Sequence, residues 1–176
     1  MTDAAGSPGP VSMPAPAAGR GFAATPQRYF RVVAVAEAIT WTLLIAGMLQ
    51  KYVFDAGEWG VSLGGGLHGF VFIVYAASVV LVAVNQRWSL GVAATGIASA
   101  VVPYATIPFD LWADRTGRLD GPWRTQADGH PSDGTVVNRL LRWGLAHPGL
   151  LAALAVVGVA VVFVTLLLIG PPGGRD

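Results

Sequence analysis

The feature that most constrains this chain is an apolar run, residues 32–49, whose only charged side chain is Glu37. Arg28 and Arg31 precede the run, and Lys51 follows it. A transmembrane helix needs about 20 mainly apolar residues, and basic side chains commonly mark its two interfaces. The run therefore predicts a membrane-spanning helix, and it makes the chain a membrane protein.

Three further apolar runs have the length of a span, at residues 63–84, 90–109 and 150–169. Pro103 and Pro108 lie in the second half of the third run, where each proline removes a backbone donor. We expect a kink near the first proline and a helix end near the second. The predicted fold class is all-α, a polytopic helical membrane protein with four transmembrane helices.

Residues 136–146 show a different pattern. Val137 and Leu140 belong to an apolar face at helical spacing, while Arg139 and Arg142 take the other face. An amphipathic segment of this kind is typical of a short helix lying along the membrane surface. We therefore add one interfacial helix to the four spans.

The runs indicate one membrane domain, residues 28–170. Residues 1–27 are rich in Ala, Gly and Pro and have no apolar stripe, so a disordered tail is predicted there. A second, short tail is predicted at residues 171–176, and a polar loop is predicted at residues 110–135.

Four spans would place both termini on the same side of the membrane. The eleven basic residues then divide into five on one side and six on the other, so the positive-inside rule does not decide the orientation. The start of the first span is more basic than its end, which favours a cytoplasmic N-terminus in the cell membrane.

Composition excludes several classes of protein. The chain has no cysteine, so disulfides, cysteine-ligated metals and thiol catalysis are ruled out. A net charge of +1 gives no basic face for nucleic acid. Phosphate-loop, nucleophile-elbow and zinc-protease motifs are missing. His130 and His147 lack metal-ligand spacing. We expect no cofactor and no metal.

Glu37 is the first candidate site residue, because a carboxylate inside a span is costly and is a functional candidate by default. The first span starts on the side where the second ends, so Asn85 and Arg87 are predicted at a similar depth. One interpretation is a structural polar anchor that pairs Glu37 with these residues. The other is a proton or cation site.

A second candidate cluster is predicted on the opposite membrane face. Lys51 ends the first span, His68 lies early in the second, and Asp110 ends the third. These side chains could form a proton relay, since histidine titrates near neutral pH. The alternative is an interfacial group of ion pairs that fixes the helix ends.

Five short motifs occur one after another along the chain. They are Arg28-x-x-Arg31-Val32-x-Ala34-x-x-Glu37, Lys51-Tyr52, His68-Gly69, Arg87-Trp88, and a proline-bearing third helix that ends Phe109-Asp110. On these motifs, residues 28–115 resemble a family of small bacterial integral membrane proteins of unknown function. The resemblance implies a three-helix core and a membrane location, and it carries no activity. The chain departs from the family pattern at Ala38, where glycine is expected, and by the tail, the long loop and the fourth span.

Three hypotheses for function remain. The leading one is a non-enzymatic structural or accessory membrane subunit, in contact with the lipid bilayer and with a second copy or a membrane protein partner. It is motivated by small residues such as Gly65 and Gly69, which allow close helix approach. The second is a small proton-coupled transporter that acts as an oligomer through Glu37. The third is a membrane enzyme that uses His68 and Asp110.

Overall fold

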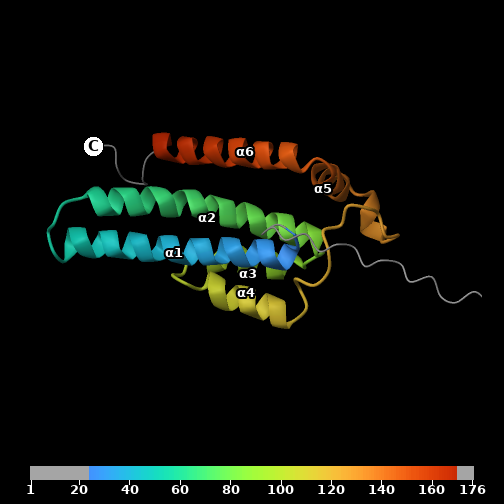
Figure 1. Cartoon of the computed structure of the whole chain (residues 1–176), viewed down its shortest axis with the longest axis horizontal. Helices are drawn as coiled ribbons and strands as arrows, with labels where there is room; N and C mark the ends of the chain where they lie inside the picture. The colour runs from blue at the N-terminus through green and yellow to red at the C-terminus, as the bar shows by residue number, and fades with distance from the viewer. Residues whose placement is uncertain (1–23, 170–176) are drawn as a thin grey trace, which may run out of the picture.

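The computed structural model describes residues 24–169, and the regular structure within that range is entirely helical (Figure 1). The predicted tails at 1–27 and 171–176 lie mostly or wholly outside the described residues. In chain order the helices are α1 (Pro26–Tyr52), α2 (Trp59–Asn85), α3 (Leu90–Ser99), α4 (Thr106–Arg115), a 3₁₀ turn η1 (Pro131–Gly134), α5 (Val136–Ala146) and α6 (Pro148–Ile169).

Three of the described helices, α1, α2 and α6, are long and apolar enough to cross a membrane. The helical membrane class is therefore confirmed, but four spans are not. The predicted span at 90–109 is two helices, α3 and α4, of 10 residues each. Each is about 15 Å long at 1.5 Å per residue, half of a hydrocarbon core of about 30 Å.

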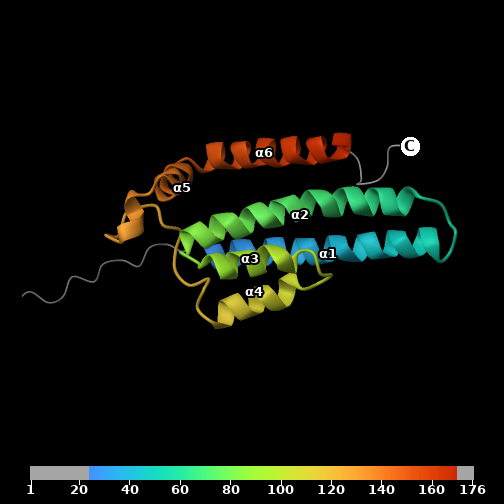
Figure 2. The ribbon, with the colours of Figure 1, turned by 180° about the vertical axis from the view of Figure 1, so that it is seen from behind.

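The connection between α3 and α4 reverses the chain. Pro103 lies in this connection, and Tyr104 beside it adopts a left-handed φ of 64°. Pro108 then falls in the first turn of α4, where a missing backbone N–H costs little. The two short helices consequently form a re-entrant hairpin, which lies along one half of the α1–α2 pair (Figures 1 and 2).

Glycines let α1 and α2 pack closely. A Cβ added at Gly47 would lie 2.4 Å from the backbone of Gly60, and one at Gly64 would lie 2.8 Å from a backbone oxygen of α1. Gly65 and Gly69, which the sequence pattern favoured, would meet only side chains at ordinary contact distance. The small-residue pair that allows the close approach is therefore Gly60 and Gly64.

An aromatic cluster forms the core where α1 begins. The Phe30 ring is fully buried, and its centroid lies 5.6 Å from that of Tyr75, 5.9 Å from that of Trp88 and 6.1 Å from that of Phe109. These rings come from α1, α2, the α2–α3 connection and α4. The core therefore joins the re-entrant hairpin to the α1–α2 pair.

Helices α5 and α6 stand apart from this core. In Figure 1, α6 lies along α2, whereas α5 is seen nearly down its own axis and so crosses the end of the bundle. Val159 is the buried hydrophobic residue of α6. The first turn of α1 and the last turn of α6 lie at opposite ends of the bundle, which differs from the arrangement that four spans would give.

Candidate functional site

The face of α1 that is turned toward the bundle carries one carboxyl group, Glu37. Phe30, Val33, Ala34 and Thr40 are buried on the same face at spacings of three and four residues. Because the helical period places Glu37 in the middle of this stripe, its side chain is 0% exposed. The site is therefore a carboxyl group enclosed between helices.

The partner of Glu37 comes from the re-entrant hairpin. The Thr106 hydroxyl, in the first turn of α4, lies 2.9 Å from Oε2 of Glu37 and 3.2 Å from the backbone oxygen of Ala34. The other carboxyl oxygen of Glu37, Oε1, is buried without a hydrogen-bond partner among the described residues.

The number of protons available to Thr106 indicates the protonation state of Glu37. The Thr106 hydroxyl has one proton but two oxygens within reach, those of Ala34 and Glu37. Both contacts are full hydrogen bonds only when Glu37 is protonated, so that Glu37 donates to Thr106 and Thr106 donates to Ala34. The geometry thus favours a neutral carboxylic acid, which also avoids the cost of a buried charge.

One and a half turns before Glu37, Arg31 connects α1 to the end of α4. Its guanidinium pairs with Asp110, whose side chain is 0% exposed, and with Asp114 at 2.8 Å. The Gln27 amide adds a hydrogen bond to Asp114. Since one arginine meets two carboxylates of α4, these contacts fix the register of the hairpin along α1.

On the other side of Glu37, His68 of α2 contacts α1. Its Nδ1 lies 3.2 Å from the Thr40 hydroxyl, and its ring centroid lies 4.3 Å from that of Trp41. The Thr40 hydroxyl donates its proton to the backbone oxygen of Glu37, so it can only accept from the histidine. This contact therefore favours the tautomer of His68 that carries its proton on Nδ1.

The structure separates Glu37 from the two residues predicted beside it. The Asn85 side-chain oxygen accepts a hydrogen bond from the backbone N–H of Arg124 at 2.9 Å. Arg87 forms an ion pair with Asp133 at 3.1 Å. Both residues thus bind the loop that follows α4, because that loop returns over the end of α2.

The second predicted cluster is divided among three places. Lys51 pairs with Glu58 at 2.8 Å across the α1–α2 turn and holds the pKa of Glu58 below its usual value. His68 lies against Thr40. Asp110 reaches Arg31 at the opposite end of the bundle, because α4 turns back instead of continuing across the membrane.

An ion-pair cluster that the sequence did not predict lies in the loop. Asp133 stands within 3.5 Å of Arg87, Arg124 and Arg142. Asp128 joins it through a 2.6 Å contact with Arg87. This loop cluster ties α2, the loop and α5 together.

Hydrogen bonds set the ionisation of the loop cluster. The Arg87 guanidinium holds the pKa of Asp128 well below its usual range. Burial acts to raise the pKa of Asp133, but the amide of Asp128 and the guanidinium of Arg87 outweigh it and lower that pKa. Arg87 also sits at a left-handed φ of 54°, a strained position for a non-glycine residue that its two ion pairs hold in place.

Sequence reasoning missed Thr106, Asp114 and Asp133 as partners. Thr106 and Asp110 lie four residues apart and so share one helical face, a signal that could have identified a polar stripe on α4. Asp133 carried no such signal, because its three arginines come from distant parts of the chain. Within residues 24–169, no three His, Asp or Glu side chains gather as metal ligands would.

Comparison with known proteins gives two matches. Residues 27–115 match the family described as "Domain of unknown function (DUF3817)". A segment of 116 residues, 64% of this chain, is 45% identical to "Putative membrane protein SCO5905" of Streptomyces coelicolor, and it spans 14% of the length of that protein. No solved structure matches. These matches confirm the resemblance to a membrane-protein family of unknown function.

Proposed function

The chain belongs to the DUF3817 family, and from this premise we propose that it works as a non-enzymatic accessory subunit of the membrane. In this proposal the α1–α2 pair and α6 span the bilayer, and the re-entrant hairpin completes a rigid module. The observation that carries the proposal is that the buried carboxylate of Asp110 forms a structural ion pair. Asp110, whose side chain is buried, binds Arg31, whose side chain is 40% exposed, and the pair joins α1 to α4.

The long relative supports a module of this kind. Its matching segment occupies only 14% of its length, so in that protein the segment accompanies other parts of a larger chain. In the present chain, α5 exposes Val136, Val137, Leu140 and Trp143, and most of α6 is also exposed. These apolar surfaces support contact with the bilayer and with a membrane protein partner.

The charge distribution supports an orientation. Eight of the nine basic residues between 24 and 169 lie at the end of the bundle where α1 begins, and Lys51 alone lies at the other end. The eight are Arg28, Arg31, Arg87, Arg115, Arg118, Arg124, Arg139 and Arg142. Because cytoplasmic segments carry the excess of basic residues, we place this end in the cytoplasm of the cell membrane.

Cysteine labelling tests both the orientation and the re-entrant hairpin, because the natural chain has no cysteine. Ala56→Cys lies in the α1–α2 turn, and Asp120→Cys follows α4; both positions are exposed. In intact cells a membrane-impermeant maleimide should label the Ala56→Cys variant but not the Asp120→Cys variant. After the cells are permeabilised, it should label both variants. Labelling of both positions in intact cells would contradict the hairpin.

A second candidate function is a proton-coupled transporter, favoured by one observation, the unpartnered Oε1 of Glu37. A transporter requires this group to release its proton to a cavity. Two cavities found between residues 24 and 169 are lined by other residues. The geometry gives no support to an enzyme that uses His68 and Asp110. His68 contacts Thr40 and Asp110 contacts Arg31, and these two residues of α1 are nine positions, or about 14 Å, apart along the helix.

Proteoliposomes separate the accessory and transport functions. Wild-type protein and Glu37→Gln would be compared for proton flux and for efflux of ethidium, a lipophilic cation, under a pH gradient. The accessory proposal expects the same passive leak from both proteins. Flux that disappears in Glu37→Gln would overturn it in favour of the transporter.

Photo-crosslinking in native membranes tests the accessory role directly. A benzophenone amino acid would replace Val161, exposed on α6, or Val137, exposed on α5. The expected product is a discrete heavier species of constant mass. Its absence at both positions, with the chain remaining monomeric, would contradict the proposal.

A further inference from the structure

A cavity of about 530 Å³ lies between α2 and α6. Its floor includes Ala77 and Ser78 of α2, and its opposite wall includes Ala152 and Ala155 of α6. Small side chains on both walls create the space, because no large side chain from either helix fills it. The volume lies within the range of about 300–1,000 Å³ that is usual for small-molecule sites.

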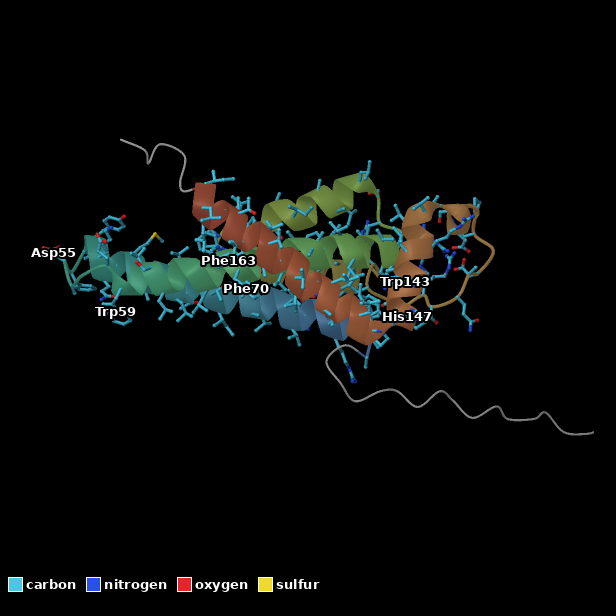
Figure 3. The ribbon with its side chains drawn as sticks, turned by 90° about the horizontal axis from the view of Figure 1, so that it is seen from above. Asp55, Trp59, Phe70, Trp143, His147 and Phe163 are labelled. Carbon is cyan, nitrogen blue, oxygen red and sulfur yellow. The ribbon has the colours of Figure 1, made fainter. Side chains whose placement is uncertain are left out.

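Apolar side chains bound the cavity at its two ends, while its side is open, since Ala152, Ala155 and Val156 are exposed. The rings of Phe70 and Phe163 meet at one end, with centroids 5.9 Å apart, and Figure 3 shows them side by side where α6 crosses α2. Leu145 of α5 and Pro148 at the start of α6 line the other end. Between these ends the cavity follows α2 from Phe70 to Leu81, eleven residues or about 16 Å.

The two side-chain hydroxyls of the cavity wall bind each other. The Ser78 hydroxyl donates to the backbone oxygen of Val74 at 2.7 Å, so in its 2.7 Å contact with Tyr29 it must accept. Tyr29 therefore donates to Ser78, and this hydrogen-bonded pair leaves no donor for a ligand. The remaining lining is mainly apolar, so the cavity is suited to an apolar occupant and not to water.

The position of the cavity identifies its occupant. Both walls are helices able to cross a membrane, so the surrounding medium is lipid. The α5 end lies near the end of α2, where the amphipathic α5 crosses the bundle. The Phe70 end lies near the middle of α2, and a length of about 16 Å is half of the hydrocarbon thickness. The cavity thus reaches from one headgroup region to the bilayer midplane.

We propose that this cavity binds one acyl chain of a bilayer phospholipid, which joins α6 to α2. A helix of a second copy is about 10 Å in diameter, so a length of about 16 Å of it occupies roughly 1,200 Å³, more than twice the volume of the cavity. An acyl chain enters from the side and fills a space of one leaflet. The lipid then supplies packing contacts that α6 lacks, since α6 makes few contacts of its own with α2.

The test uses the full chain reconstituted in bilayers of phosphatidylcholine that carries a diazirine in one acyl chain. After irradiation, peptide mapping should find the lipid adduct on the cavity walls, at α2 residues 74–81 and α6 residues 151–156. Ala155→Trp and Ala77→Trp, which fill the cavity, should each reduce this adduct several-fold. Val157→Trp, on an exposed face of α6, is the matched control and should leave the adduct unchanged.

Native mass spectrometry gives a second measurement, and Ala152→Leu gives a milder variant if a tryptophan prevents folding. Wild type should retain one more lipid in detergent than the filled variants. Equal adducts on the cavity walls and the exposed face of α6, or no response to filling, would overturn the proposal. So would a crosslink at these walls to another copy of α6 or to residues 1–23 of the same chain.

Discussion

The contact of α1 with α4 and the contact of α2 with α6 differ in kind. Helix α4 is held against α1 by an ion pair and by the hydrogen bond between Glu37 and Thr106. Helix α6 touches α2 through apolar side chains and leaves a cavity between them. In a bilayer, lipid tails compete with apolar contacts but cannot replace a buried ion pair. Polar contacts therefore fix α4, whereas α6 depends on what fills the space beside it.

Of the changes at these two contacts, breaking the polar contact is expected to have the largest effect. Arg31→Met would leave Asp110 buried without its counter-ion. Loss of one partner from a buried pair costs roughly 3–5 kcal/mol, and because the Arg31 side chain is 40% exposed we expect about 2–3 kcal/mol. The measurement is the free energy of unfolding in detergent micelles.

Two variants serve as controls for Arg31→Met. Arg28→Met, at an exposed position of the same helix, should change the unfolding free energy by less than about 0.5 kcal/mol. Asp110→Leu combined with Arg31→Met should recover part of the loss, because apolar replacements of buried pairs are often tolerated. Equal losses for Arg28→Met and Arg31→Met would remove the distinction between the two contacts.

The α1–α2 contact allows a test of whether close packing of two helices stabilises the protein where no ion pair joins them. Gly64→Ala places a methyl group 2.8 Å from a backbone oxygen of α1 and should cost about 1–3 kcal/mol. Gly66→Ala meets nothing within 4 Å and should be neutral or stabilising. The pair is compared by thermal unfolding, and similar values for both would show that the helices do not pack through Gly64.

The loop cluster should respond to pH. The pKa values of Asp128 and Asp133 are lowered in the folded protein, so their contribution to stability is complete above the usual aspartate pKa of about 4 and is lost as the pH falls below it. Hydrogen exchange should therefore show residues 118–135 opening as the pH falls below about 4, while α1 and α2 stay protected. Asp133→Asn should already be open at neutral pH; uniform exchange throughout would contradict a local cluster.

A smaller effect is expected at the α6 contact. Phe163→Ala removes the ring that meets Phe70, but lipid can occupy the vacated space, so the loss should stay below about 1 kcal/mol. Phe109→Ala in the aromatic core is the matched truncation and should cost roughly 3–5 kcal/mol. A large loss for Phe163→Ala would mean that α6 is fixed by protein contacts.

The smallest effect is expected for Glu37→Gln. The amide keeps a donor for Thr106, as the protonated acid does, so stability should change by less than about 0.5 kcal/mol. Infrared spectroscopy should show the carbonyl stretch of a protonated carboxylic acid in wild type and its disappearance in the variant. A carboxylate band in its place would show that Glu37 is ionised.

Some of this arrangement could be read from the sequence. Apolar runs are local, so they identified the three helices long enough to cross a membrane, and the amphipathic pattern matched the bounds of α5. The run at 90–109 is also apolar, and hydropathy cannot tell one span from two short helices. The reversal depends on Pro103 and Tyr104, together with the polar side chains of Thr106 and Asp110, which need partners on α1.

The sequence could not identify the polar partners of these residues, because their predicted depth in the membrane depends on the number of spans and four were expected. Once α4 turns back, Asp110 moves from the level of Lys51 to the level of Arg31. The same reversal moves the basic residues of the long loop to the end where α1 begins. This one difference in connection changes the neighbours of Asn85, Arg87 and Asp110, although the sequence identifies each of them as a candidate.

The short length of the re-entrant hairpin also gives the molecule an uneven cross-section. At the end where α1 begins, α3 and α4 add their width to the three long helices, whereas the α1–α2 turn at the other end has no such addition (Figure 2). The protein is therefore a wedge. A wedge displaces more lipid on one side of the bilayer than on the other, so it should concentrate where the membrane is curved to match.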